Sequence, residues 1–510
     1  MSSTLRFRNA AAITMDVPCP QANTVLVEGN RIVWVGDEKD APHTRADRVI
    51  DCAGATLLPG LSDAHIHLLA YAASLLHMDC SRRTVSSITD LHRLIGSQAQ
   101  TTPAGQWLRG VGYDEFHLAE KRHPTRYDLD PAAPRHPVRL DHRSSHACVL
   151  SSLGLREVGI TADTPDPVDG VIVRDDSGEP TGLLLEMNSY VSQRMPQQNQ
   201  NILHQSVDKA SRQLLAWGIT SLQDATPGNG LEQWKTLLRL TQAGAIRQRL
   251  TFMPGIHHLQ QFTADGLTHN MGGSTMTIGP TKLVATLTTG ALHPPEGEIR
   301  RLVHEAHQAG SPVAVHAVEH EVVMTVTRVL KEASAGSRIS PHRDRIEHCS
   351  EATPDVLEQL TDSGITVVTQ PGFLYESGER YHAEVPAELQ PWLYPLNALR
   401  QAGVPLAAGS DAPVASPNPW QGLYAAVTRR DSSGLALHPE QSISIEEALA
   451  LWTSGAAYAA GQEQTWGMLR SGMLADLVLL DRDVTRAPPE ELLTCPVAMT
   501  IMGGDVVWEA

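Results

Sequence analysis

The carboxyl-terminal part of the chain alternates short apolar runs with helix-like segments, and this rhythm constrains the fold more than any other feature. It begins near Trp217 and continues for most of the remaining sequence. In one segment that Gly310 ends, apolar residues recur at helical spacing on a single face: Ile299, Leu302, Val303 and Ala306. Such alternation is typical of βα units whose strands form a parallel sheet. The sequence therefore predicts an α/β fold.

The apolar runs can be placed as individual strands and helices. We predict strands over 219–224, 249–253, 282–285, 312–316, 345–348, 365–370 and 404–411. We predict helices over 231–243, 321–332, 353–363, 395–402 and 444–460, the last with Ser444 and Glu447 at the spacing of a capping box. The runs 57–67 and 107–113 are further strand candidates. Because a (β/α)8 barrel has eight places, we assign 57–67 to the first and 107–113 to an insertion.

The chain ends and the segment after the first strand differ from this pattern. Residues 5–58 and 466–510 both contain short alternating β-like runs separated by Gly and Asn turns. The region of about 80–200 lacks the βα rhythm and is rich in Pro, His, Arg and Asp. We therefore expect a composite β-sandwich from 1–58 and 466–510. A barrel over 59–465 would carry an insertion at about 80–200.

Composition excludes some classes of partner and location. The 510 residues carry a formal net charge of −17, which argues against nucleic acid because phosphate binding needs clustered Lys and Arg. The sequence has no run of about 20 apolar residues, the length that spans a membrane. The first residues do not resemble a secretory signal. The 6 cysteines contain no CxxC pair, which suggests reduced thiols in a cytoplasmic protein. We expect a small-molecule substrate.

Several predicted strands end in residues that commonly bind zinc. His65 and His67 follow an apolar run, and residues two apart on a strand point to the same face. His316, His348 and Asp411 each close a later strand. The carboxyl ends of barrel strands face the mouth where active sites lie. A single strand-end His can be a buried core residue, but four strands ending this way predict a metal site.

Lys282 lies in the apolar fourth strand, where an unpaired ammonium group is costly to bury. One interpretation is an ion pair with a neighbouring acid. The other is a lysine whose pKa burial lowers, so that its neutral amine reacts with carbon dioxide to give a carbamate bridging two metal ions. The residue pattern leaves both open.

The ordered motifs DAHIH, TKL, VAVHA, RIEHCS, GSDAPV and GMLADLVLLDRD resemble the amidohydrolase superfamily. With the large insertion, they are most similar to its N-substituted formamide deformylase-like branch, the YtcJ-like proteins of amidohydrolase family 3. The resemblance implies a distorted TIM (β/α)8 barrel, a small terminal β-sandwich and a zinc-activated hydroxide, and it is compatible with a homodimer. It implies the metal ligands His65, His67, Lys282, His316, His348 and Asp411.

One departure from the family pattern bears on the number of zinc ions. Family members commonly carry an acidic residue two to four positions after the lysine, whereas Val284, Ala285 and Thr286 follow here. Glu186, in the insertion, is a reserve carboxylate that would replace or assist Lys282, or cap a helix. His146 resembles a position that reaches substrate, although a surface role fits as well. One or two zinc ions remain compatible with the sequence.

These residues favour hydrolysis of a carbon–nitrogen bond in an amide, formamide or carbamate. Asp411 would take a proton from water and deliver it to the leaving amine, and His348 would bind metal or stabilise the oxyanion. The alternative is a mononuclear zinc deaminase in which Glu319, three residues after His316, is the proton shuttle and contacts substrate. A non-catalytic metal-binding protein is a third interpretation.

Overall fold

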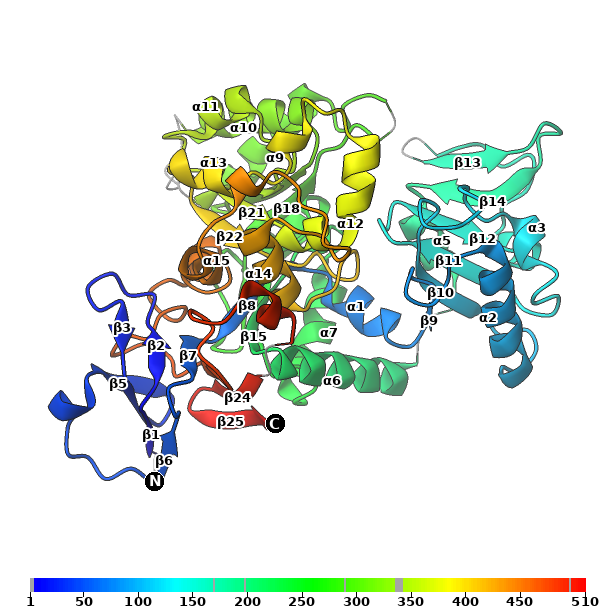
Figure 1. The fold of residues 1–510 in the computed structure, drawn as a ribbon. Helices are drawn as coiled ribbons and strands as arrows, with labels where there is room; N and C mark the ends of the chain where they lie inside the picture. The colour runs from blue at the N-terminus through cyan, green and yellow to red at the C-terminus, as the bar shows by residue number, and fades with distance from the viewer. Residues whose placement is uncertain (1–3, 168–169, 197–198, 289, 335–342, 495–496) are drawn as a thin grey trace. The chain divides into compact units, whose positions relative to one another are not determined.

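The computed structural model describes residues 4–510 apart from 168–169, 197–198, 289, 335–342 and 495–496. The chain divides into two compact units (Figure 1). The first comprises Met1–Leu68 and Val207–Ala510, and the second Leu69–Ser206. Each unit has its own sheets and is described separately below.

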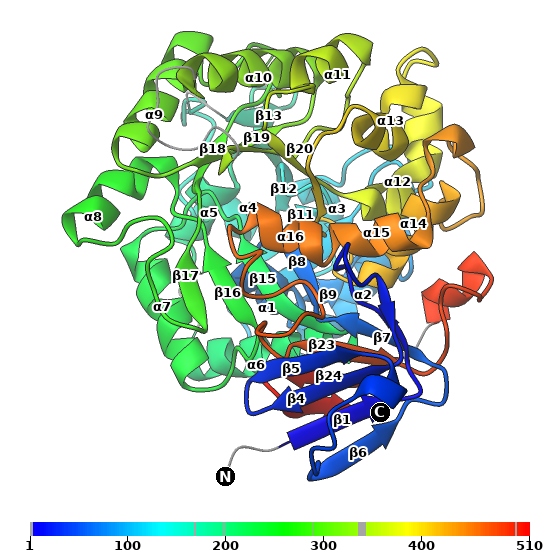
Figure 2. The ribbon, with the colours of Figure 1, turned by 90° about the vertical axis from the view of Figure 1, so that its left-hand side faces the viewer.

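Two parallel sheets form the centre of the first unit (Figure 2). One has the order β17-β16-β15-β8, formed by Met276–Ile278, Arg249–Phe252, Ile219–Asp224 and Leu61–Ile66. The other runs from β18 to β22 in sequence order, formed by Thr281–Val284, Val313–Ala317, Arg345–His348, Thr366–Thr369 and Leu406–Ala408. All strand pairs in both sheets are parallel. The βα prediction is confirmed for this part of the chain.

Backbone contacts join these two sheets. Lys282 at the start of β18 forms a parallel bridge with Gly255, and its N–H donates to the carbonyl of Pro254 at 2.8 Å. At the opposite edges, the N–H of Asp411 donates to the carbonyl of His65 at 2.7 Å. The hydrogen bond between Asp411 and His65 brings the carboxyl ends of β8 and β22 side by side.

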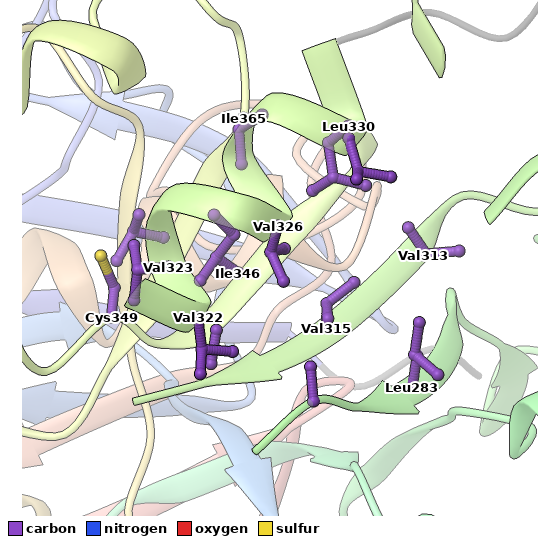
Figure 3. Packing of buried hydrophobic residues seen from close by; sticks show 14 of the residues in the cluster. Leu283, Val313, Val315, Val322, Val323, Val326, Leu330, Ile346, Cys349 and Ile365 are labelled. Atoms are coloured by element: carbon purple, nitrogen blue, oxygen red, sulfur yellow. The ribbon is translucent and has the colours of Figure 1, made fainter. Parts of the chain in front are cut away.

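Helices follow most of the strands. They are α6 (Gln200–Ala216), α7 (Leu231–Gln242), α8 (Leu259–Ala264), α9 (Glu296–Gln308), α10 (His320–Ser334), α11 (Pro354–Leu360), α12 (Pro371–Glu384), α13 (Leu396–Gln401), α14 (Pro419–Thr428), α15 (Ile445–Leu451) and α16 (Ser454–Ala459). In α9 the buried residues are the four that the sequence places on one face. Figure 3 shows Val322, Val326 and Leu330 of α10 packed with Val315 and Ile346 of the sheet. Each such side chain contributes about 1.5–3 kcal/mol to folding.

The two chain ends form two further sheets in the first unit. One has the order β5-β4-β1-β6, from Arg31–Gly36, Thr24–Glu28, Thr4–Arg8 and Arg48–Asp51. The other has the order β25-β24-β23-β7-β2-β3, from Asp505–Glu509, Val497–Met502, Leu477–Leu480, Thr56–Pro59, Ala11–Ile13 and Gln21–Ala22. Phe7 and Val25 of the first sheet share one hydrophobic cluster with Leu477 and Ile501 of the second.

The second unit is built on one mixed sheet of order β13-β14-β12-β11-β10-β9. Its strands are Val171–Arg174, Pro180–Leu185, Ala147–Leu150, Val138–His142, Leu108–Tyr113 and Met78–Asp79. The strands β9, β10 and β11 are parallel and the remaining pairs antiparallel. Helices α2 (Ile88–Thr101), α3 (Arg126–Leu129), α4 (Ser152–Glu157) and α5 (Asn188–Arg194) belong to this unit. The candidate strand 107–113 therefore lies outside the parallel sheets of the first unit.

The structure corrects some element boundaries. The run predicted as one strand over 57–67 is two strands, β7 and β8, separated by Gly60. A Cβ atom at Gly60 would lie 2.1 Å from the hydroxyl of Thr220, so the chain passes too close to β15 for a side chain. The helix predicted over 444–460 is two helices, because Thr453 leaves helical geometry at φ −127° and ψ −96°. The capping box of Ser444 and Glu447 is confirmed.

Two further observations bear on the composition arguments. Among the described residues, no helix is long and apolar enough to cross a membrane. The described cysteines, Cys19, Cys52, Cys80, Cys148 and Cys349, are all free thiols, and Cys495 lies outside the described residues. The cellular compartment remains a prediction.

Candidate metal centre

The end of β8 and the loop after β22 are held together by a buried carboxylate. Asp63 is 1% exposed. Its Oδ1 accepts from the N–H of His65 at 3.1 Å and from the N–H of Ser410 at 2.9 Å, while Oδ2 accepts from the Ser410 hydroxyl. Burial raises the pKa of Asp63 to about 6, although these hydrogen bonds oppose the shift. Asp63 thus positions His65 and, one residue beyond Ser410, Asp411.

Imidazole and carboxylate groups from separate strands converge at this edge. His67 Nε2 lies 2.9 Å from Asp411 Oδ1, and His65 Nε2 lies 3.5 Å from the same oxygen. Ligand atoms of His65, His348 and Asp411 all lie within 4.8 Å of one another. The ring of His316 packs on that of His348 with centroids 4.4 Å apart. The structure therefore brings together all four predicted histidine ligands and the predicted aspartate.

The outer ring nitrogens of three of these histidines are engaged by other side chains. The Nδ1 partners are Glu347 for His65, Thr226 at 3.1 Å for His67, and Gln370 at 2.7 Å for His348. A hydrogen bond at Nδ1 fixes the ring orientation and leaves Nε2 for a metal, as in most protein metal sites. The Nε2 atoms of His65 and His67 both approach Asp411, as the distances above show.

A buried ion pair supports His65. Arg345 and Glu347 are both 0% exposed and hydrogen-bonded to each other on β20. The other nitrogens of Arg345 donate to Gln223 and to the carbonyl of Ala64 at 2.7 Å. Burial would raise the pKa of Glu347, but the Arg345 guanidinium and His65 hold it well below its usual value. Glu347 is therefore a carboxylate that can accept the Nδ1 proton of His65.

The same electrostatics keep the ligand groups in the protonation states that metals bind. Burial, with Lys282 nearby, lowers the pKa of His65 to about 3, and burial also lowers the pKa of His348. Burial would raise the pKa of Asp411, but His67 and His65 hold it far below its usual value. Neutral imidazoles beside an ionised carboxylate are the ligand forms that Zn²⁺ requires. The donor set thus fits a zinc ion.

Lys282 is 2% exposed at the start of β18. Its Nζ is buried and forms no hydrogen bond with any described residue. Burial lowers the pKa of Lys282 to about 8, although Glu347 and Asp411 act in the opposite direction. An orphaned buried amine is costly, which suggests that a group outside the polypeptide completes its environment.

Two of these residues have strained backbone conformations. His348 has φ +74° and Asp411 has φ +59°, in the left-handed region that side chains with a Cβ rarely adopt. Each costs on the order of 1–3 kcal/mol and is typical of functional sites. The left-handed backbone redirects both side chains, at His348 where β20 ends and at Asp411 in the segment after β22.

The remaining candidates lie elsewhere. Glu319 follows β19 by two residues, and its Oε2 is buried without a hydrogen bond to any described residue. His146 and Glu186 belong to the second unit, where His146 Nδ1 lies 2.9 Å from a Glu186 oxygen. Glu186 is not the cap of an insertion helix, because Met187 precedes α5 as its N-cap.

Sequence reasoning missed the supporting shell of the site. Glu347, Gln370 and Thr226 contact the candidate ligands only through tertiary structure. Arg345 supports Glu347, and Asp63 joins His65 to Ser410, which is distant in sequence. One signal was present in the sequence. Arg345 and Glu347 occupy consecutive inward positions of a strand expected to be apolar, and buried charges in a strand require partners.

The sequence is similar to a known protein family and to proteins with assigned names. The sequence model described as "Amidohydrolase family" matches residues 48–508. The N-substituted formamide deformylase of Arthrobacter pascens is 29% identical, with 98% of this chain and 97% of that protein covered. The putative amidohydrolase YtcJ of Bacillus subtilis (strain 168) is 25% identical over 90% of each chain.

Solved structures share the fold. An uncharacterised metal-dependent hydrolase from Pyrococcus horikoshii OT3 has a TM-score of 0.76 and 21% identity, covering 96% of this chain and 99% of that one. Atrazine chlorohydrolase from Arthrobacter aurescens TC1, complexed with zinc, has a TM-score of 0.58 and 15% identity, covering 99% and 95%.

Proposed function

The chain belongs to the amidohydrolase family, and from this premise we propose that it is a zinc-dependent hydrolase of N-substituted amides or formamides. The observation that carries the proposal is the convergence of His65, His67 and His348 on Asp411, with the Nδ1 atoms of the three histidines engaged by other side chains. The name of the Arthrobacter pascens relative favours a formamide within this substrate class.

We assign the metal ligands within this cluster as part of the proposal. His65, His67 and Asp411 would hold one zinc ion, and His316 with His348 would complete this site or hold a second ion, with Lys282 as a further ligand. A bound zinc ion supplies a Lewis acid for the scissile carbonyl and lowers the pKa of water from about 16 to about 7.

Proton transfer is assigned to Asp411. Its carboxylate is ionised and lies at the centre of the cluster, so it can accept a proton from the attacking water. It then delivers this proton to the leaving nitrogen, because an amide anion is a poor leaving group. His348 lies within 4.8 Å of Asp411 and would bind metal or donate to the developing oxyanion.

The fold assignments that support this mechanism are part of the proposal. We infer that the two parallel sheets close into a distorted (β/α)8 barrel, since backbone hydrogen bonds join them at Lys282 and at Asp411. We also infer that the chain ends, 1–58 and 466–510, form a β-sandwich domain, because both terminal sheets share one hydrophobic cluster. His146 and Glu186 remain candidates for contacting a small-molecule substrate.

Lys282→Ala tests whether the centre holds two metal ions. If Lys282 is a carbamate bridge, this variant is expected to lose one zinc equivalent per chain and most of its turnover, because the bridging ligand is gone. Zinc content and kcat measured on the same preparation check it. Lys282→Met is the matched control for burial, since it keeps the volume without the amine. Full zinc content and turnover in both variants would show that Lys282 is structural.

A mononuclear deaminase is the second candidate, because the buried Oε2 of Glu319 forms no hydrogen bond with a described residue. A substrate panel separates the two activities. The hydrolase proposal predicts carboxylate release, with formate from N-substituted formamides, and no ammonia from aminopurines. Ammonia release together with loss of turnover in Glu319→Gln would support the deaminase instead.

A further inference from the structure

The second unit contains another cluster of imidazole and carboxylate groups. Strands β10 and β11 are parallel neighbours, and Tyr113 at the end of β10 pairs with His142 at the end of β11. Asp114 and Glu115 follow β10 directly. Because parallel strands end at the same edge of a sheet, this register brings both carboxylates beside the His142 ring.

These side chains are largely buried and close together. One ligand atom each from Asp114, Glu115 and His142 lies within 4.8 Å of the others. Asp114 is 6% exposed and His142 is 7% exposed. Ligand atoms on one zinc ion lie about 3–4 Å apart, given bonds of about 2.0–2.2 Å. The cluster thus has the size of a metal site.

The contact between His142 and Glu115 is not a hydrogen bond. His142 Nε2 lies 2.7 Å from Glu115 Oε2, yet this buried nitrogen has no partner with hydrogen-bond geometry among the described residues. The candidate metal centre shows the same feature, since Asp411 Oδ1 lies 2.9 Å from His67 Nε2 without a hydrogen bond. Nitrogen and oxygen atoms that lie this close without forming a hydrogen bond fit ligands that share a metal ion.

The outer nitrogen of His142 is engaged, as in the centre described above. Its Nδ1 lies 2.7 Å from the Ser144 hydroxyl and accepts from the Ser144 N–H at 3.2 Å. These contacts orient the ring with Nε2 directed at the carboxylate, where a metal ion would replace the Nε2 proton. Around the cluster, Arg143 lies 3.6 Å from Asp114, and the ring of His123 lies 5.6 Å from that of His142. The arginine offsets one of the two carboxylate charges, so a dication meets a site with net negative charge.

We propose that Asp114, Glu115 and His142 bind a divalent transition-metal ion of the zinc class in the second unit. Two carboxylate oxygens and one imidazole nitrogen are suitable ligands for Zn²⁺, with water at the remaining positions. This site is independent of the ligands proposed on β8, β19 and β20, and it does not require the hydrolase activity.

Zinc binding by the full-length protein tests the site. Wild type, Glu115→Gln and His142→Ala are equilibrated at one free zinc concentration fixed by a chelator buffer, and bound zinc per chain is measured. We expect both variants to bind one zinc equivalent fewer than wild type. Glu179→Gln is the control, because Glu179 is an exposed acid of the same unit.

Cobalt provides a second readout. Co²⁺ bound to nitrogen and oxygen ligands absorbs visible light, so the titration of wild type is expected to show a contribution that Glu115→Gln lacks. Glu115→Gln preserves the side-chain shape, so it still tests the proposed metal site if His142→Ala fails to fold. Equal zinc content and equal cobalt spectra in wild type and Glu115→Gln would overturn the proposal and leave a Glu115–His142 ion pair.

Discussion

Replacing His65 or His67 with alanine is expected to lower kcat/KM by roughly a thousandfold or more. Each change removes a ligand, and loss of a Lewis acid costs several kcal/mol of transition-state stabilisation, with about 1.4 kcal/mol per factor of ten. Bound zinc per chain is expected to fall in parallel. Both quantities are measured on the purified variants.

The fold is expected to survive these substitutions. When His65 is removed, Glu347 keeps its hydrogen bonds to Arg345, so no buried charge is left unpaired. His304→Ala is the matched control, because His304 is an exposed imidazole on α9. Wild-type zinc content and turnover in His67→Ala would contradict the assigned ligand set.

Asp411→Asn is expected to lower kcat by about 100- to 10,000-fold, the usual contribution of a positioned acid–base group. The amide keeps the shape of the side chain but cannot shuttle a proton. The loss is expected to be smaller for substrates whose leaving amine is weakly basic, such as anilides with electron-withdrawing groups, since these need less protonation. Turnover across a series of leaving groups, with zinc content measured in parallel, checks this.

The leaving-group series distinguishes two roles for Asp411. A residue that only binds metal would lose the same factor with every leaving group, because the attack step alone is affected. A residue that also protonates the amine would show a loss that grows with amine basicity. A uniform loss accompanied by lower zinc content would therefore contradict the proton-transfer assignment.

Local patterns predicted the candidate ligands because each depends on short-range geometry. His65 lies near the end of β8 and His67 directly follows it, and His316 and His348 lie at or next to the ends of strands that the βα rhythm located. Asp411 lies three residues beyond β22, so it belongs to a loop rather than to a strand end. The prediction still placed it at the correct edge, because that loop passes directly beside β8.

The supporting contacts could not be predicted in this way. Glu347 meets His65, and Gln370 meets His348, across strands whose relative register no local pattern contains. Strand β17 and helix α12 were also missed. The first has only three residues, and the second begins Pro-Gly and has no clear apolar face. In both cases tertiary packing determines the structure more than local preference does.

The region of about 80–200 shows a related limit. It was set apart because it lacks the βα rhythm, yet β9, β10 and β11 form a parallel ladder there. The connection from β9 to β10 contains the regular helix α2, but β9 itself has only two residues. The connection from β10 to β11 contains the short helix α3 and irregular segments rich in Pro and His, which hide the periodicity. The division of the whole chain into a composite β-domain and a barrel domain remains a prediction.

Metal analysis of the purified protein together with a formamide hydrolysis assay tests the central claim most directly. The account predicts one to two zinc equivalents per chain in the candidate metal centre. Removing them with a strong chelator should abolish formate release, and adding zinc back should restore it. A preparation that stays fully active after all metal has been removed would contradict the account.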